Sequence, residues 1–385
     1  MELEEVMLLS ELTIFVPSYN RPLALERVIE YWRDTPVMVH ILDGSDTPWF
    51  PKEVLQGKSN ITYHHLPKVS NESAMQNYRR RMLYSLGISC TKFTAICADD
   101  DFFAISGLSK VLYELDKSSE IQAALGAELW FTVQSGRLLC RLIHVNDLKN
   151  DESLSPEVAI RLKNGLSLFY GIFKTDFFET RQRLSFEHFF ENAEHLEMLT
   201  QYVSRSILRS RAFPHVFWLR QSDVLSQFKY TAKRGHLSRK ESRQALFHFK
   251  EQLVKAVQIG DARLSLVEAK QIVKKFLRTD WRTGTKAEML RDQLKKRIWR
   301  NLDTVSIRIP LPIKQKFNLW SQKLLSRDVF ALMSFERSLS VGRREIDVYS
   351  SELVKAGIGF ELAELHKFEE LLLKPRGELR LLANI

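Results

Sequence analysis

Short apolar runs alternate with helical patterns along the first hundred residues. The apolar runs have five or six residues each, and they cover residues 12–17, 37–42, 61–65 and 93–98. Each run ends in polar or turn-forming residues, which is typical of strands. Residues 22–32 and 73–86 repeat apolar positions at helical spacing, and Gly87 is expected to cap the second helix. The order β-α-β-β-α-β predicts an α/β sheet with helices on both faces.

The rest of the chain adds strands and then changes to helices. A helix is expected at 107–115, and strands are expected at 121–131, 137–145, 165–173 and 213–220. Amphipathic helices follow at 244–259, 264–277 and 286–302. We therefore expect two domains, an α/β domain over residues 1–228 and a mainly helical region over 229–385.

The two expected domains differ in charge. The chain has 57 Lys and Arg against 47 Asp and Glu, a net charge of +10. Residues 231–385 hold 32 of the basic and 18 of the acidic side chains, so they carry +14, and residues 1–230 carry −4. The basic character therefore belongs to the helical region.

Composition favours a soluble protein of the cytoplasm. Apolar residues make up 44% of the chain, and no apolar run approaches the roughly 20 residues that span a bilayer. The first five residues, MELEE, are too acidic for a secretory signal. Three cysteines (Cys90, Cys97 and Cys140) are too few and too irregularly spaced for a disulfide framework.

Three adjacent carboxylates, Asp99, Asp100 and Asp101, follow the apolar run 93–98. They repel one another, and a divalent metal with oxygen ligands would neutralise them. Ligands collect at the carboxyl ends of strands in open α/β sheets, which favours a binding site here. The alternative is a solvated acidic turn. His64 and His65 are not expected to bind one ion together, because adjacent strand residues point to opposite faces.

Three motifs resemble those of family-two glycosyltransferases with the GT-A fold. Residues 13–21 (TIFVPSYNR) resemble that family's opening "(V/I)-P-x-Y-N-R", and 42–46 (LDGSD) resemble its "D-G-S-x-D" signature. Residues 98–101 (ADDD) resemble its "DxD" metal motif. The resemblance covers about the first 225 residues. It implies a Rossmann-like nucleotide-diphospho-sugar transferase that uses Mn²⁺ or Mg²⁺ and transfers a sugar to an acceptor hydroxyl with inversion.

The resemblance also implies roles for particular residues. The nucleoside would be held by Pro17, Tyr19, Arg21 and Asp43, and Gly44 would let the backbone approach a ligand closely. Asp101 is the first choice as metal ligand, and Asp99 would contact the ribose or support the metal through water. Asp100 completes the donor-binding set. The family often has a further Asp where this chain has Ala98, so the resemblance leaves the ligating aspartate open.

An inverting transfer needs a base that takes the proton from the acceptor hydroxyl. In the family this base is an acid at a helix start, some 90 residues after the metal motif. Glu194 is 93 residues after Asp101 and is the first choice, and Glu197 is the second. The family usually has Asp where His195 stands. The alternative is that these acids only stabilise a helix N-terminus through its dipole.

The helical region suggests further contacts. His236, in the basic loop 233–236, could close the donor site or join the metal. Five basic residues gather beside Ile298 and Trp299, and they are Arg291, Lys295, Lys296, Arg297 and Arg300. This helix either packs its apolar side on the α/β domain, with a homodimer as a further use, or docks on an anionic inner membrane face. Docking would suit a lipid-linked acceptor. In bacteria the resemblance points to surface polysaccharide synthesis.

Two other functions compete with glycosyl transfer. A metal-dependent nucleotidyltransferase would usually carry a Gly-rich basic loop after the first strand, and residues 17–22 do not form one. A non-catalytic glycan- or nucleic-acid-binding protein could use the basic region. We expect no nucleic-acid partner, because no nucleic-acid motif is recognised.

Overall fold

The computed structural model describes residues 7–49, 60–88, 91–134, 137–143, 168–190, 193–221, 239–279, 344–345, 350, 353–354 and 357–374. The chain divides into two compact units, one of Met1–Val273 with Arg344–Ile385 and one of Lys274–Arg343. The account below concerns the first unit. The predicted domain boundary between residues 228 and 229 lies outside the described residues and stays a prediction.

The described strands form one mixed sheet in the order β10-β7-β6-β8-β4-β1-β2-β3, and β9 joins β5 to β6. Strands β3, β2, β1 and β4 are parallel neighbours, whereas β8 is antiparallel to both β4 and β6. The strand bounds are β1 Leu12–Ser18, β2 Met38–Asp43, β3 Ile61–His65, β4 Phe93–Ile96, β5 Phe102–Phe103, β6 Ala123–Gln134, β7 Arg137–Ile143, β8 Ile172–Lys174, β9 Ser210–Gln221 and β10 Arg344–Glu345. The α/β class predicted from the sequence is confirmed.

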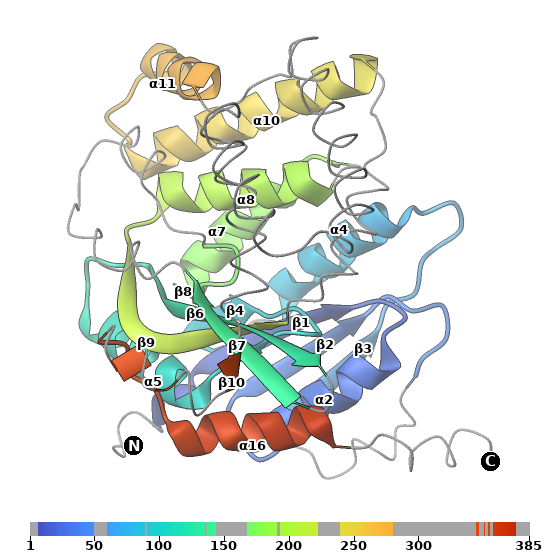
Figure 1. The fold of residues 1–385 in the computed structure, drawn as a ribbon. Coiled ribbons are helices and arrows are strands. Elements are labelled where there is room, and N and C mark those ends of the chain that lie inside the picture. Colours follow the sequence, from blue (N-terminus) through green and yellow to red (C-terminus); the bar gives the residue numbers. More distant parts are fainter. Residues whose placement is uncertain are drawn as a thin grey trace, which may run out of the picture. The chain divides into compact units, whose positions relative to one another are not determined.

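Helices cover both faces of the sheet (Figure 1). The helices α2 (Pro22–Trp32), α5 (Ile105–Lys117) and α16 (Leu362–Leu373) lie on one face, and α4 (Ala74–Tyr84), α7 (Thr175–Phe186) and α8 (Ala193–Ile207) lie on the other. The helix α10 (Arg239–Gly260) packs on α8, and α11 (Leu266–Thr279) follows it. No helix in the described part of the chain is long and apolar enough to cross a membrane.

Local sequence explains where these helices begin and end. Pro22 occupies the first turn of α2, where its missing N–H costs nothing. Ser73 and Gln76 form a capping box at the start of α4. Gly87 does not cap α4 as expected, because Ser85 continues in helical conformation and residues 85–87 form a 3₁₀ turn.

The C-terminal helix α16 is part of the core of the sheet unit. Its Glu364 accepts hydrogen bonds from the backbone N–H groups of Ile105 and Ser106, at the start of α5, and from the Ser106 hydroxyl. Phe368 packs edge-on against Phe102 and Phe131, with ring centroids 5.2 and 5.0 Å away. A segment more than 250 residues downstream therefore supplies the cap that α5 lacks in its own sequence.

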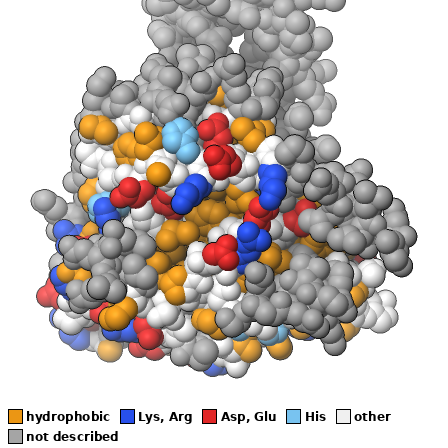
Figure 2. Space-filling model, turned by 90° about the horizontal axis from the view of Figure 1, so that it is seen from below, with side chains coloured by type: hydrophobic (Ala, Val, Ile, Leu, Met, Phe, Trp, Pro, Cys, Tyr) orange, Lys and Arg blue, Asp and Glu red, His pale blue; other side chains and the backbone are white. Residues whose placement is uncertain are grey.

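The face that carries α2 and α16 is seen from below in Figure 2. Lys and Arg side chains lie beside Asp and Glu side chains there, with hydrophobic side chains between them. The Lys374 ammonium pairs with the Glu30 carboxylate at 2.7 Å and joins the end of α16 to α2. The described part of this face does not present one sign of charge. The five basic residues of 291–300 lie outside the described residues, so the membrane contact stays a prediction.

Candidate donor and metal site

The carboxyl ends of β1, β2 and β4 meet at one edge of the sheet. Ser18 and Asp43, the last residues of β1 and β2, are register partners. The backbone N–H of Cys97, just after β4, donates to the carbonyl of Phe15 in β1 at 3.0 Å. The three aspartates that follow Cys97 therefore lie beside the end of β1, as the sequence predicted for a ligand site in an α/β sheet.

Asp99 is buried and already bound to cationic and hydroxyl groups. Its carboxylate accepts hydrogen bonds from the Ser18 hydroxyl at 2.7 Å and from the Arg21 guanidinium at 2.6 Å. Burial raises the pKa of Asp99 to about 6, although the charge of Arg21 acts in the opposite direction. Arg21 also pairs with the more exposed Asp100 at 2.7 Å. Arg21 thus lies across two of the three carboxylates, where a metal or a phosphate would otherwise act.

Asp101 is a buried residue, with 4% of its surface exposed. Its Oδ1 accepts a hydrogen bond from the backbone N–H of Gln221 at 2.9 Å. Burial and the neighbouring charge of Asp100 raise the pKa of Asp101 well above its usual value, and Arg220 only partly offsets this. The antiparallel pairing of β5 with β9, which brings Phe102 opposite Leu219, explains this environment.

A second pair of charged residues, which the sequence did not single out, lies next to Asp101. Arg220 of β9 binds Glu128 of β6 at 3.2 Å. The Arg220 guanidinium also lies over the rings of Trp130 and Trp218, 4.9 and 5.0 Å from their centroids. Burial is the main cause of the raised pKa of Asp101, and the charge of Glu128 adds a small part to it. The only sequence signal for this pair was a lone acid inside the apolar strand 121–131.

Asp43 is fully buried at the end of β2, and both of its oxygens have partners. Oδ1 accepts from the backbone N–H of Ser45 at 2.9 Å and from its hydroxyl at 2.5 Å. Oδ2 accepts from the Tyr63 hydroxyl at 2.6 Å, and burial together with this bond raises the pKa of Tyr63. A nucleoside that contacts Asp43 would therefore share it with these two residues.

The other two residues predicted to hold the nucleoside lie on the same side of the sheet edge. Pro17 is within β1, paired with Leu42 of β2. Tyr19 follows β1, and the Lys68 ammonium lies 5.2 Å from the centre of its ring.

His64 and His65 point to different partners, as expected, since His64 meets His40 at 3.0 Å and His65 meets the carbonyl of Ser45 at 2.8 Å.

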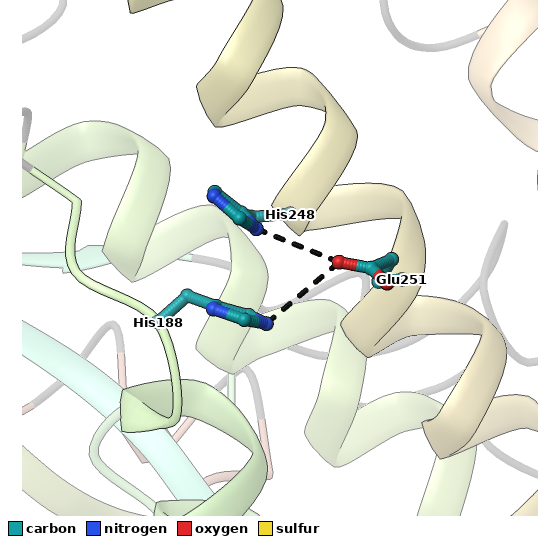
Figure 3. A group of neighbouring side chains, drawn as sticks. All are labelled: His188, His248 and Glu251. Carbon is teal, nitrogen blue, oxygen red and sulfur yellow. Dashed lines mark ion pairs between the residues drawn. The ribbon is translucent and has the colours of Figure 1, made fainter.

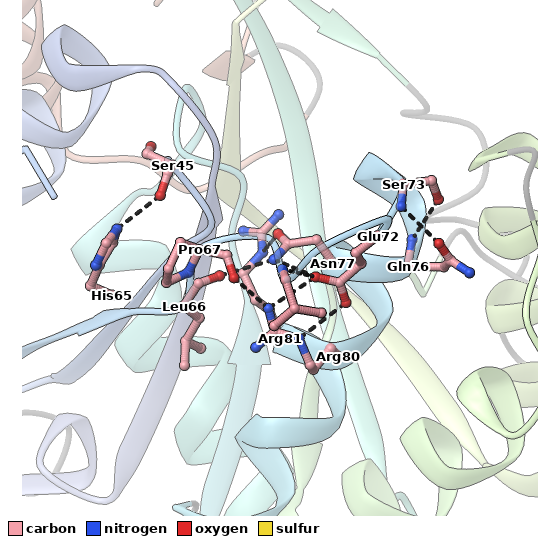
Figure 4. Close-up of polar contacts among 11 residues, drawn as sticks. Ser45, His65, Leu66, Pro67, Glu72, Ser73, Gln76, Asn77, Arg80 and Arg81 are labelled. Carbon is pink, nitrogen blue, oxygen red and sulfur yellow. Dashed lines mark hydrogen bonds and ion pairs between the residues drawn. The ribbon is translucent and has the colours of Figure 1, made fainter. Parts of the chain in front are cut away.

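The space beside Gly44 is filled by side chains of α4. Arg81 is buried and donates to the carbonyls of Ser18 and Leu42, each at 2.7 Å. It also donates to the Asn77 Oδ1 at 2.9 Å, within the same helix (Figure 4). A Cβ at Gly44 would lie 2.2 Å from the Asn77 Oδ1 and 2.8 Å from the Arg81 Nε. Glycine is therefore required for the packing of α4, which differs from the ligand approach predicted from the sequence.

The other two arginines of the Arg79–Arg81 run are also engaged. Arg80 binds Glu72 and the carbonyl of Pro67, and Arg79 donates to the carbonyl of Phe186 at the end of α7. All three arginine side chains therefore fasten α4 to neighbouring segments.

We expect Gly44→Ala to lower the free energy of unfolding by about 1–3 kcal/mol, the usual range for overpacking. The methyl group would displace Asn77 or Arg81 and leave the carbonyls of Ser18 and Leu42 without their donor. Chemical denaturation measures the change. Gly87→Ala is the matched control, since a Cβ at Gly87 meets no atom within 4 Å; equal stability of the two variants would contradict the packing argument.

The two predicted bases lie on α8, and the structure describes the side chain of one of them. The Glu197 side chain is exposed. Burial raises the pKa of Tyr170, and the charges of Asp101 and Glu197 add to this effect.

The apolar face of α8 is buried, and its members are Leu196, Leu199, Val203 and Ile207. The side chain of Glu194 and the loop with His236 lie outside the described residues. Tyr170, whose ring centroid is 4.4 Å from that of Trp218, was missed because its segment showed only an apolar pattern.

The donor atoms at this edge suit a hard divalent cation. Asp99, Asp100 and Asp101 offer carboxylate oxygens only, as Mg²⁺ and Mn²⁺ prefer. The raised pKa values of Asp99 and Asp101 arise from burial and from the charge of Asp100. A bound cation would offset both effects, so the residues present fit the metal.

Comparison with known proteins gave matches among solved structures only. No protein-family model and no curated sequence matches the chain. S. aureus TarS 1–349 in complex with UDP is similar at 12% identity and a TM-score of 0.46, over 80% of this chain and 78% of that one. TarS 1–349 in complex with UDP-GlcNAc matches at 15% identity and a TM-score of 0.43, over 69% and 71%.

A mannosyltransferase is also similar to this chain. Mannosyltransferase PcManGT from Pyrobaculum calidifontis, in complex with GDP-Man and Mn²⁺, matches at 15% identity and a TM-score of 0.38. The match covers 77% of this chain and 83% of the mannosyltransferase. At such low identities and TM-scores, the function of this protein has to be argued from its own site.

Proposed function

We propose that the protein is a metal-dependent glycosyltransferase of the GT-A type. It transfers a sugar from a nucleotide-sugar donor to an acceptor hydroxyl, with inversion. The observation that carries the proposal is the placement of Asp99, Asp100 and Asp101 beside Ser18 and Asp43, at the carboxyl edge of parallel strands. This is the edge where α/β sheets bind nucleotides.

Asp101 and Asp99 would hold the metal, and Asp100 would support it. A Mn²⁺ or Mg²⁺ ion there supplies electrostatic stabilisation of the charge that grows on the leaving diphosphate. Arg21 pairs with Asp99 and Asp100, and it would turn to the donor phosphates once these carboxylates face a cation. Pro17, Tyr19 and Asp43 would border the nucleoside.

The acceptor would lie between the metal site and α8. Glu194 or Glu197, both on α8, would take the proton from the attacking hydroxyl, and the Glu197 side chain is exposed. Tyr170, which is half-buried and in ring contact with Trp218, offers an aromatic ring that suits a sugar. The proposal includes three further properties. The acceptor is a glycan or a lipid-linked glycan in bacterial surface polysaccharide synthesis, the protein makes a peripheral contact with the inner membrane, and it forms a homodimer.

Thermal unfolding with a panel of nucleotide sugars tests the proposal. The neighbours' complexes suggest UDP-GlcNAc and GDP-Man as the first members of the panel. At a donor concentration of 100 times Kd, binding to the native state should add about 2.7 kcal/mol of stability, and only with Mn²⁺ or Mg²⁺ present. Stabilisation by nucleoside triphosphates, with pyrophosphate released on turnover, would instead identify a nucleotidyltransferase. No stabilisation by any nucleotide would contradict both functions.

A further inference from the structure

A second cluster of metal-ligating side chains lies at the junction of α7 and α10 (Figure 3). His188 follows the last residue of α7 by two positions, and His248 and Glu251 lie three residues apart on α10. One ligand atom from each residue lies within 4.8 Å of the others. Within the described ranges no other group of three such residues meets this criterion. The proposed donor site does not include these residues.

The distances suit a small tetrahedral ion. Glu251 Oε2 lies 3.8 Å from His188 Nε2 and 3.5 Å from His248 Nδ1. Ligand atoms around tetrahedral zinc, with bonds of about 2.0–2.1 Å, lie about 3.3 Å from one another. Small side-chain rotations would therefore bring all three atoms to bonding distance. Two imidazoles and one carboxylate form a donor set that favours Zn²⁺ over Mg²⁺.

The rings of the two histidines stack with centroids 4.1 Å apart. The Nδ1 of His248 is buried and makes no hydrogen bond in the structure. A neutral imidazole nitrogen without a hydrogen bond can accept a metal ion.

An ion pair also joins α10 to the residue after α7, without any metal. Lys255, one further turn along the same face of α10, pairs with Glu187 at 2.6 Å. This contact joins α10 to the residue that precedes His188, so the three ligands are brought together before a metal binds. Such preorganisation lowers the free-energy cost of binding.

We propose that His188, His248 and Glu251 form a zinc site, with water as the fourth ligand, that fastens α10 to the end of α7. The site is separate from the proposed donor site and does not depend on the proposed function. The other interpretation is that the histidines only pack as rings and pair with Glu251 when protonated.

The test measures metal binding by the full chain after chelator treatment. Every protein tested carries the Asp101→Asn substitution, so that the proposed donor site contributes little. We record isothermal titrations with Zn²⁺ and absorption spectra with Co²⁺, which serves as a visible substitute for Zn²⁺. We expect one Zn²⁺ per chain, a four-coordinate Co²⁺ spectrum, and no competition by Mg²⁺. His248→Gln and Glu251→Gln should each lower Zn²⁺ affinity by about 100-fold or more, since loss of a mere supporting partner already costs 10–100-fold.

A matched control is available on α16, where His366 and Glu369 form a similar i, i+3 pair at 3.7 Å. His366→Gln should leave Zn²⁺ affinity unchanged, and Zn²⁺ should raise the melting temperature of this control but not of His248→Gln. Glu251 is 43% exposed, so Glu251→Gln should fold even if a histidine variant does not. Wild-type affinity in Glu251→Gln and His248→Gln, or a six-coordinate Co²⁺ spectrum, would overturn the proposal.

Discussion

Asp101→Asn is expected to abolish the Mn²⁺-dependent part of nucleotide diphosphate binding. A metal ion at a phosphate site contributes several kcal/mol, so the affinity measured with Mn²⁺ should fall by roughly 10²-fold or more. Asparagine is the right replacement, because its side-chain oxygen can still accept the hydrogen bond from the Gln221 N–H. Calorimetric titration of UDP and GDP, with and without Mn²⁺, measures the loss.

The same variant should not be less stable than the wild type in the absence of metal. Burial and Asp100 disfavour the charge on Asp101, so a neutral side chain relieves repulsion in the folded state. Asp34→Asn, which neutralises a carboxylate that is 77% exposed, is the control. An Asp101→Asn variant that folds and keeps full Mn²⁺-dependent affinity would show that the metal lies elsewhere.

Glu197→Gln is expected to preserve donor binding and to lower turnover by roughly 10²–10⁴-fold, the usual effect of losing a general base. Glu197 is exposed on α8, so its carboxylate is accessible to an acceptor hydroxyl. Single-turnover rates with a saturating donor separate chemistry from binding. Glu194→Gln is tested in parallel, because the family resemblance makes Glu194 the first choice for the base.

The two variants distinguish three outcomes. Loss of turnover in Glu194→Gln alone assigns the base to the start of α8, and loss in Glu197→Gln alone assigns it one turn later. Full activity of both variants would mean that the acids only stabilise the helix, through its dipole. Glu179→Gln on α7, which removes an i, i+4 ion pair with Arg183, controls for charge loss on this side of the sheet.

The sequence predicted the strands and their polar ends because both signals are local. Asp43 and Asp99 directly follow apolar runs, and the carboxyl ends of parallel strands meet at one edge. The burial of Asp101 could not be predicted in the same way. It depends on the pairing of β5 with β9, more than 100 residues later, and no local pattern encodes that register.

Arg220 and Glu128 were missed for the same reason. Arg220 has the pattern of a polar residue at the end of a strand, and Glu128 is the one acid in another, apolar strand. Each residue gains its role only from the other strand, through the ion pair between them. Gly44 shows a related limit, because the sequence indicates that a side chain is excluded but not which neighbour excludes it. Here the neighbours are Asn77 and Arg81, which come from α4.

The cap that Glu364 places on α5 has a consequence for biosynthesis. The bond from the Ser106 N–H to Glu364 joins residues 258 positions apart, so the start of α5 stays uncapped until residue 364 has left the ribosome. The aromatic surface formed by Phe102 and Phe131 also lacks Phe368 until then. A nascent chain that lacks α16 would therefore expose the apolar surface that Phe368 later covers. Chaperones that recognise apolar surface would be able to bind this face until α16 packs on it.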